Sequence, residues 1–396
     1  MKVYIVTNIA FPNGMAPGNR IKCYAGALAS AGVDCEVIVY RRTERYGTMP
    51  QNTDGEGIVY GVHYHYIGGT PLRGSNVLIR RYHDLADKQK LKRYLQKNLK
   101  IGDVLFAYAG MDVDFNIILA RQAHRQGAKY VRDLCELPYG TMAETPKAVK
   151  KRRKTEEKLL PLCDGIIPIS DALKNYARQY AQSCSMLKLP ILVDYDNYFL
   201  PNRTAETVIP FLFHSGTLTE QKDGILGMIE AFALAANELP FPVMMICTGK
   251  KESSFHAGEI DALIQRYRLE EKLLFTGYLN DEDLRTYLSR ASLVVINKHV
   301  NQQNTYCFST KLGEYMAAGK PIIITRVGEA MNWLKNGIDA VFIEPEDTQA
   351  LKQAIKELFL NAEQRSSLGD NARITCKEHF DYHVHGHEMK QFFEAI

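Results

Sequence analysis

The sequence predicts an α/β protein built from two Rossmann-like, doubly wound halves. It opens with an apolar strand, KVYIVTN, then a turn-rich loop and a helix at 20–31, and a second strand, CEVIVY, follows Gly32. A βαβ opening of this kind leads to a parallel sheet covered on both faces. The same alternation starts again at VIPFLFHSG, beyond a polar stretch that contains Pro201. Ligands of such folds lie at the carboxyl ends of the strands, so we expect a cleft between the halves.

Each element rests on a hydrophobic pattern. In the first helix Ile21, Tyr24 and Leu28 recur at helical spacing and form one apolar stripe. Polar residues near 195–207 predict the linker between the halves. Further apolar runs predict strands at 103–109, 129–134, 165–170, 243–249, 272–278, 293–297, 321–325 and 340–344.

Length and composition narrow the class of protein. With 396 residues and 46% hydrophobic content the chain can bury a large core, and its length favours two domains. We find no apolar run long enough to span a bilayer and no secretion leader at the start, so we expect an unexported protein. The eight cysteines are scattered without a CxxC pair, which is typical of reduced thiols in a cytosol.

Positive charge is concentrated in two stretches. Residues 73–100 hold nine Lys and Arg against two Asp, and 147–158 hold seven Lys and Arg against two Glu, although the whole chain carries only +4. An anionic partner on one side is expected. Leu78, Tyr82 and Leu85 stand at helical spacing among the first set of cations, as in a helix on an anionic membrane surface. A core-facing helix with a solvated outer face has the same pattern. No basic module with interleaved aromatic residues is visible, so nucleic acid is the weaker candidate.

The stretch FSTKLGEYMAAGKPIIIT, residues 308–325, is the most informative motif. A hydroxyl- and lysine-bearing turn opens a short helix with one carboxylate, Glu314, and Gly319 and Pro321 lead into an apolar strand. Amides at a helix start favour an anion, and a carboxylate one turn further can accept hydrogen bonds from a ribose. This motif indicates a nucleotide-sugar enzyme. A buried helix–turn–strand whose Glu faces water is the alternative.

A second motif, GTLTEQKDGILGMIEAF, runs from residue 216 to 232. It combines a strand end, a loop with Lys222 and a helix that begins near Asp223. A lysine there can neutralise a phosphate that gains charge as a sugar leaves. A solvated surface lysine is the alternative.

Together with LLFTGYLNDEDLRTYLSRASLVVIN, RDLCELP and GIIPISDAL, these motifs resemble, in order and spacing, the retaining GT-B glycosyltransferases of the family 4 type. The resemblance extends over nearly the whole chain. It implies two Rossmann-like domains that face a central cleft: 1–200 on the acceptor side and 201–378 for the nucleotide sugar. It also implies that 379–396 is a helix that crosses back to the first domain.

The resemblance also assigns roles to residues. Lys222 would contact the donor diphosphate and Glu314 the ribose hydroxyls, and Asp133 and Glu136, in RDLCELP, would position the acceptor hydroxyl or stabilise positive charge on the sugar. A pairing of Arg132 with Glu136, or a cap for the next helix, is the alternative. The implied donor-binding residues are Gly14, Gly18, Arg20, Gly216, Thr217, Gly249, Gly277, Tyr278, Leu279, Ser309, Thr310, Lys311 and Leu312.

Three positions depart from the family pattern. Thr217 stands where an arginine is common, Tyr306 where many members have a second glutamate, and Arg132 where a histidine is frequent. Lys311 or Arg20 is our candidate for the missing phosphate cation.

We expect no metal and no cofactor. DVD at 112–114 and DED at 281–283 look like helix starts, and the histidines at 379, 383, 385 and 387 are irregularly spaced. A lysine and a helix N-terminus can neutralise the leaving diphosphate instead.

The resulting expectation is a metal-independent, retaining hexosyltransferase-type enzyme of polysaccharide or glycoconjugate synthesis. It would transfer a sugar from a UDP-linked or other nucleotide diphosphate donor to a hydroxyl of a glycan or lipid-linked acceptor. The expected location is the cytoplasm, with peripheral attachment to the inner face of the membrane as a variant. Two alternative functions are a nucleotide-sugar epimerase or hydrolase of the same fold and a degenerate non-catalytic subunit that binds nucleotide sugars. A third and more remote alternative is a dinucleotide-dependent oxidoreductase. The loop FPNGMAPGNR lacks the GxGxxG pattern that such an enzyme would need.

Overall fold

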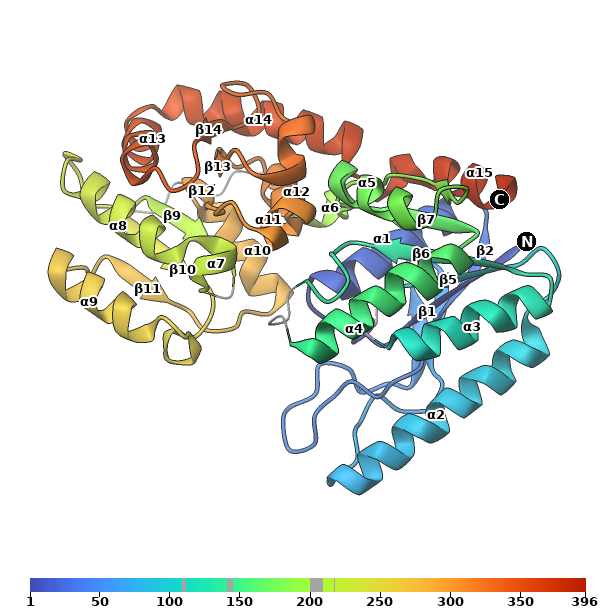
Figure 1. Ribbon diagram of the computed structural model, residues 1–396. Helices are drawn as coiled ribbons and strands as arrows, with labels where there is room; N and C mark the ends of the chain where they lie inside the picture. Colours follow the sequence, from blue (N-terminus) through green and yellow to red (C-terminus); the bar gives the residue numbers. More distant parts are fainter. Residues whose placement is uncertain (109–111, 141–144, 200–208, 217) are drawn as a thin grey trace. The chain divides into compact units, whose positions relative to one another are not determined.

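The computed structural model describes residues 1–108, 112–140, 145–199, 209–216 and 218–396 (Figure 1). The chain divides into two compact units. Unit 1 comprises Met1–Val193 together with Tyr382–Ile396, and unit 2 comprises Asp194–Asp381. The linker expected near 195–207 falls partly on residues 200–208, which lie outside the described residues.

Unit 1 is an α/β unit with one eight-stranded sheet. Its strand order is β3-β4-β2-β1-β5-β6-β7-β8, and every neighbouring pair is parallel except β3 and β4. The strands are β1 (Lys2–Thr7), β2 (Asp34–Val39), β3 (Glu56–Val59), β4 (Val62–Tyr66), β5 (Val104–Ala107), β6 (Lys129–Leu134), β7 (Gly165–Pro168) and β8 (Ser185–Met186). The helices are α1 (Ala16–Ser30), α2 (Val77–Asn98), α3 (Val113–Arg125), α4 (Pro146–Lys154), the π-helix η1 (Thr155–Leu159), the 3₁₀ turns η2 (Leu160–Leu162) and η5 (Tyr382–His385), α5 (Asp171–Tyr180) and α15 (Gly386–Ala395).

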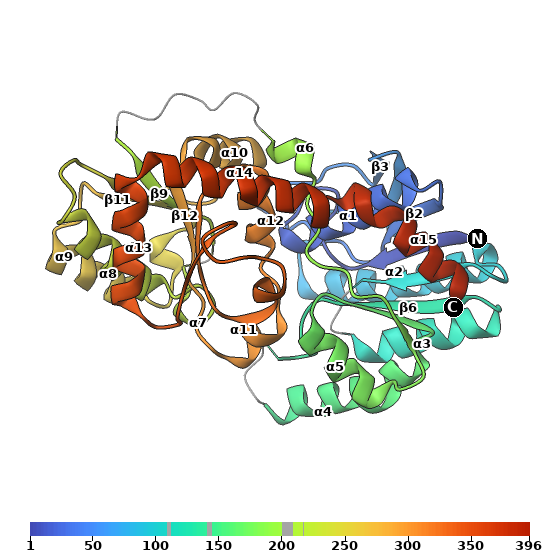
Figure 2. The ribbon, with the colours of Figure 1, turned by 90° about the horizontal axis from the view of Figure 1, so that it is seen from above.

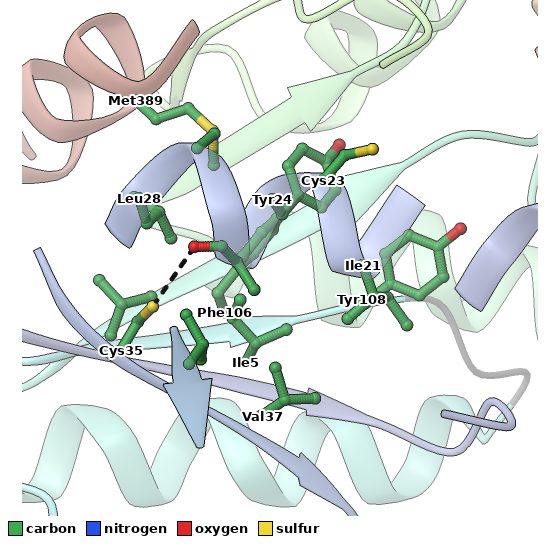
Figure 3. Close-up of a cluster of buried hydrophobic side chains, with 14 of the residues drawn as sticks. Ile5, Ile21, Cys23, Tyr24, Leu28, Cys35, Val37, Phe106, Tyr108 and Met389 are labelled. Carbon is green, nitrogen blue, oxygen red and sulfur yellow. Dashed lines mark hydrogen bonds between the residues drawn. The ribbon is translucent and has the colours of Figure 1, made fainter. Parts of the chain in front are cut away.

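The core of unit 1 joins the start of the chain to its end. Figure 3 shows Tyr24 and Leu28 of α1 above the strands that carry Ile5 and Phe106, with Met389 of α15 beside them. Helix α15 packs on α1, and Met389 is fully buried. A Cβ on Gly386 would lie 2.2 Å from the carbonyl oxygen of Ala27, so only glycine allows α15 to approach α1 this closely.

Unit 2 is a six-stranded, wholly parallel sheet with helices (Figure 2). Its order is β11-β10-β9-β12-β13-β14. The strands are β9 (Phe211–His214), β10 (Met244–Cys247), β11 (Leu273–Phe275), β12 (Leu293–Ile296), β13 (Ile322–Thr325) and β14 (Val341–Ile343). The helices are α6 (Tyr195–Tyr198), α7 (Glu220–Asp223), α8 (Ile225–Ala236), η3 (Lys251–Ser253), α9 (Ala257–Tyr267), α10 (Asp281–Arg290), α11 (Gln302–Tyr306), α12 (Thr310–Ala317), η4 (Gly328–Asn332), α13 (Thr348–Leu360) and α14 (Ala362–His379).

Helices α8, α9 and α13 share one core in unit 2. Helix α8 contacts both α9 and α13, while α12 packs on α14 and α6. Strand β9 is buried along its whole length, as a central parallel strand must be. Because β9 and β12 are neighbours in the sheet, the loops after them are brought to one edge.

Some elements differ from those expected. Helix α1 begins four residues earlier, because Pro17 fits the first turn of a helix. The hairpin β3–β4 was not foreseen. It turns through Tyr60 and Gly61, both at positive φ, and tyrosine rarely adopts that conformation. The cap of α10 is Asn280, whose side chain accepts from the amide of Asp283, rather than the acidic run itself.

Among the described helices, none combines the length and the apolar composition needed to cross a bilayer.

Candidate functional site

Three glycines predicted to bind the donor meet at the carboxyl ends of β9, β10 and β11. The amide of Gly216 donates to Thr248 Oγ1 (2.9 Å), and the amide of Gly249 donates to the carbonyl of Gly277 (2.8 Å). Gly249 has a φ of +94°, and a Cβ there would lie 3.0 Å from the carbonyl oxygen of Gly216. The close backbone approach therefore requires glycine at this position.

Lys311 of α12 meets Asp223 of α7 over the same loop. Its Nζ lies 2.5 Å from Asp223 Oδ1, and the two side chains are 17% and 4% exposed. The neighbouring Lys311 ammonium holds the pKa of the Asp223 carboxyl well below its usual range, against the opposing effect of burial. A Cβ on Gly216 would lie 2.7 Å from Lys311 Nζ, 2.8 Å from His214 Nε2 and 3.1 Å from Asp223 Oδ2. These three side chains thus converge on Gly216.

His214 is the last residue of β9 and is buried. Neither ring nitrogen has a hydrogen-bond partner among the described residues. Burial, and then the positive charge of Lys311, lower its pKa to about 4. The imidazole is therefore neutral at physiological pH. The positive charge next to Gly216 comes from Lys311 and not from His214.

A second lysine, Lys298, lies in the loop after β12. It is buried, and its Nζ donates to Asn304 Oδ1 (3.1 Å) and to the carbonyl oxygen of Lys222 (3.5 Å). Burial, then the charge of Lys311, lower its pKa to about 8. Lys298 therefore holds α7 against the loop after β12 and adds positive charge next to Lys311.

Lys222 and Glu314 belong to the two elements that this ion pair joins. Lys222 is exposed on α7, one residue before Asp223. Glu314 lies one turn after Lys311 on α12 and is partly buried. Tyr198 donates a hydrogen bond to the Glu314 carboxylate, yet burial raises the pKa of Glu314 to about 7.

The start of α12 supplies backbone donors but not every predicted side chain. Ser309 is its N-cap and makes no capping bond with its own side chain, and Thr310 is its first residue. Leu312 is fully buried. Its side chain belongs to the core, so only its backbone can take part in donor binding.

The remaining predicted donor residues of unit 2 lie along neighbouring loops. Tyr278 is 61% exposed and Leu279 is half-buried, and both follow Gly277 after β11. Tyr306, the departure from the second glutamate, is the last residue of α11. Thr217 lies outside the described residues.

In unit 1, Arg20 and Asp133 form a buried pair. Arg20 Nε lies 3.4 Å from Asp133 Oδ1, and their side chains are 3% and 0% exposed. The guanidinium also donates to the carbonyls of Pro190 (2.7 Å) and Leu189 (3.3 Å), and Tyr24 Oη donates to Asp133 Oδ1 (2.5 Å). This network links α1 to β6 and to the segment after β8, which is a structural use of two residues predicted to act on substrate.

The other predicted residues of unit 1 have different environments. Gly14 and Gly18 both face the carbonyl oxygen of Ala10. A Cβ would lie 2.6 Å from this oxygen at Gly14 and 2.9 Å from it at Gly18. That contact accounts for both glycines without a ligand. Glu136 is exposed, and the neighbouring Arg132 is buried with two nitrogens that lack partners among the described residues.

Sequence reasoning did not single out His214, Lys298 or Tyr198 as site residues, and it used Asp223 only to mark a helix start. His214 and Lys298 could have been found from the sequence, because His214 ends an apolar strand and Lys298 closely follows one. Polar residues at these positions reach the ligand edge of a parallel sheet. No pattern marked Tyr198, which acts through a contact between distant segments.

A large hollow of about 770 Å³ in unit 2 has a different chemical character. Its lining includes Glu220, Glu230, Glu259, Glu346 and Asp347. Carboxylates repel a diphosphate, so we assign the donor site to the loops around Gly216. In the part of the chain that the structure describes, we find no group of three or more His, Cys, Asp or Glu side chains arranged to hold a metal ion.

Two parallel-sheet Rossmann-like units of this topology define the GT-B fold, which confirms the fold predicted from the sequence. Solved structures agree over the full chain. Sucrose-phosphate synthase from Thermosynechococcus elongatus has a TM-score of 0.74 at 17% identity and covers 100% of this chain and 99% of its own. Anabaena Alr3699/HepE in complex with UDP has a TM-score of 0.70 at 14% identity and covers 100% of both chains.

Residues 204–375, which include most of unit 2, match the family model Glycosyl transferases group 1. The O-antigen chain mannosyltransferase C of Escherichia coli is 29% identical over 127 residues, which is 31% of this chain and 33% of the relative. The capsular polysaccharide biosynthesis glycosyltransferase CapM of Staphylococcus aureus is 25% identical over 162 residues, 35% of this chain and 43% of the relative. The first matches cover only about a third of the relatives' length.

Proposed function

We propose that this chain is a glycosyltransferase of polysaccharide or glycoconjugate synthesis. It takes a sugar from a nucleotide diphosphate donor, UDP-linked, and passes it to a hydroxyl of a glycan or lipid-linked acceptor. The observation that carries the proposal is the ion pair between Lys311 and Asp223. It joins the lysine-bearing turn of α7 to the start of α12.

In this proposal the donor diphosphate binds where α7 meets the start of α12. The first amides of α12 have no partner inside the helix and favour an anion. Lys311 lies at the same helix start, next to Gly216, where a side chain would block the approach. Lys222, exposed on α7, supplies the second cation. Because Arg20 is buried in unit 1 with three protein partners, Lys311 is the better replacement for the missing phosphate cation.

Glu314 fits the role of ribose ligand. A carboxylate has about four lone-pair sites, so the bond from Tyr198 leaves room for ribose hydroxyl donors. The loop at Gly249 and residues 277–279 would border the base. The solved complex of Alr3699/HepE with UDP supports a uridine nucleotide as donor.

The chemistry follows the family resemblance. The bond between the anomeric carbon and the β-phosphate oxygen breaks, and the acceptor oxygen bonds to that carbon on the same face. The hydroxyl proton passes to the departing phosphate oxygen. Lys222, Lys311 and the helix amides stabilise the charge that the diphosphate gains, so no metal is required in this proposal. Asp133 holds Arg20 and Tyr24 and acts as a positioning residue. Glu136, which is exposed, is the carboxylate that remains accessible for the acceptor.

The test is nucleotide binding followed by transfer. A panel of nucleoside diphosphates and nucleotide sugars should raise the melting temperature, because a ligand of the native state stabilises it. Lys222→Ala should lose at least about 100-fold in transfer, with unchanged stability, while Lys335→Ala, another exposed lysine, should retain activity. No thermal shift with any nucleotide would refute the donor site.

Two rivals are separated by the same assay. Turnover of a nucleotide sugar without any acceptor would indicate a hydrolase or epimerase. Donor binding without transfer, insensitive to Lys222→Ala, would indicate a degenerate binding subunit. The proposed location is the cytoplasm.

A further inference from the structure

Helix α2 changes character along its length. Leu78, Tyr82 and Leu85 form one stripe near its start and are 76%, 69% and 68% exposed. Leu91 and Leu95, further along, are fully buried. Figure 1 shows the N-terminal end of α2 extending away from the sheet of unit 1. The apolar spacing of this helix therefore serves the core only in its second half.

A hollow of about 190 Å³ lies beside the exposed end. Arg41, Arg42, Arg73, Arg80 and Arg81 line it, and Asp84 is the one carboxylate among its described lining residues. Arginine is suited to phosphate because its planar guanidinium presents several donors in a fork.

The positive charge of this hollow is only partly compensated. Arg41 pairs with Asp84 (3.4 Å) and Arg42 with the buried Asp87 (3.1 Å). Arg73 Nε instead donates to the carbonyl of Arg42 (2.9 Å). Burial lowers the pKa of Arg73, and repulsion from the nearby Arg41 lowers it further. An anion in the hollow would relieve that repulsion.

The loop after β2, which begins with Arg41 and Arg42 of the hollow, carries further exposed apolar side chains. The amide of Thr43 donates to the carbonyl of Pro71 (2.9 Å), which ties the loop after β2 to the segment before α2. On that loop Tyr46 and Met49 are 70% and 96% exposed. Exposed apolar side chains thus lie on α2 and on the loop after β2, and each of these segments also contributes arginines to the hollow.

We propose that this end of unit 1 is a docking surface for an anionic lipid bilayer. A lipid phosphate occupies the arginine hollow, and Leu78, Tyr82 and Leu85 enter the boundary between headgroups and acyl chains. Charge complementarity selects this occupant, because apolar side chains rimmed by arginines match the two layers of an anionic leaflet. The inference does not depend on the donor site of unit 2.

The second basic stretch, 147–158, lacks this combination. Lys154 pairs with Asp114 and Arg153 with Glu157. Val149, at 44%, is the one large hydrophobic side chain of α4 that is exposed. The structure therefore assigns the membrane surface to the start of α2 and leaves 147–158 as a solvated helix, which serves as an internal control.

The experiment is co-sedimentation of the full chain with vesicles of phosphatidylcholine, alone or mixed with phosphatidylglycerol. The chain should bind the mixed vesicles only. Arg80→Glu/Arg81→Glu should weaken partitioning by about 20-fold or more, since each basic residue near an anionic surface contributes roughly a fivefold factor. Leu78→Ser/Tyr82→Ser should also weaken it. Lys150→Glu/Lys158→Glu, with the same change in charge, should lose far less.

Other outcomes would overturn the proposal. Two of them are absence of binding to mixed vesicles and an equal loss of binding in the 147–158 control. Release of the chain by inorganic phosphate at matched ionic strength would instead indicate a site for soluble phosphate. A change from dimer to monomer on Leu78→Ser/Tyr82→Ser would indicate an interface between two copies of the chain. An unchanged melting temperature and an unchanged UDP-induced shift in each variant show that folding and the donor site are intact, so the two proposals can fail separately.

Discussion

Lys311 Nζ and Asp223 Oδ1 lie 2.5 Å apart, and this contact links the start of α12 to α7 in a largely buried setting. The same lysine lowers the pKa of His214 and of Lys298. The Lys311 ammonium group thus acts, after burial, on the ionisation of two further side chains of the candidate donor site.

Removal of Lys311 should separate its two roles. Lys311→Met leaves the Asp223 carboxylate buried without its cation, which should cost about 3 kcal/mol of unfolding free energy. It should also abolish the thermal shift caused by UDP. Asp223→Asn/Lys311→Met should recover most of the stability but none of the binding. UDP binding that survives in the double variant would show that Lys311 is not the phosphate cation.

Glu314 should make donor binding dependent on pH. Its pKa is raised to about 7, and ribose hydroxyls donate best to the ionised carboxylate. Affinity for a nucleotide sugar should therefore increase as the pH rises through about 7. The diphosphate of a nucleotide sugar is esterified at both ends and does not titrate there. Calorimetry of Glu314→Gln should give weaker binding, by about 10-fold, with no such pH dependence.

The same raised pKa predicts the direction of a stability change. In the folded chain Glu314 stays protonated up to about pH 7, whereas its usual pKa is 4.5. The unfolded chain therefore binds fewer protons between these values, and this group's favourable contribution is lost as the pH rises from about 4.5 to 7. Urea unfolding should show a smaller decline over this window in Glu314→Gln. An unchanged decline would contradict the raised pKa.

Gly216→Ala should damage the donor site through a single methyl group. The added Cβ would meet Lys311 Nζ at 2.7 Å and His214 Nε2 at 2.8 Å, so the lysine must move. We expect UDP affinity to fall at least about 10-fold and stability to fall by about 1–3 kcal/mol. Gly258→Ala in α9 has open space and should be neutral or slightly stabilising. Equal effects in the two variants would exclude a local cause.

The substitution Arg20→Met should destabilise the folded chain, and not only reduce its activity. The change leaves Asp133 buried without its cation and removes the donors to Leu189 and Pro190. A loss of about 3–5 kcal/mol is expected, measured by chemical denaturation. A stable Arg20→Met variant with weakened donor binding would instead favour the ligand role that the sequence predicted.

Much of the fold could be predicted because parallel strands are continuous apolar runs. Strand β6 has the predicted bounds, 129–134, and β9 to β14 all lie within the predicted runs. The hairpin β3–β4 could not be predicted, because tyrosine at a left-handed position of its turn is a poor turn signal. The two-residue strand β8 is too short to leave a pattern.

The candidate site was predictable where local pattern alone defines it. The motif at 308–325 located the start of α12, and the roles given to Lys222 and Glu314 stay predictions. What the sequence could not indicate is pairing between distant segments. Arg20 and Asp133 are 113 residues apart, and their burial together gives them a structural partner that no local pattern reveals.

The return of the chain to unit 1 at Tyr382 has a consequence for biosynthesis. Met389 and Phe393 fill the core beside α1, yet they follow the whole of unit 2 along the chain. During synthesis the strands of unit 2 are all available before unit 1 receives its segment from Tyr382 onward, so unit 2 can complete its sheet first. A nascent chain stalled before residue 386 should therefore carry one finished and one unfinished domain, and the latter is a natural client for chaperones.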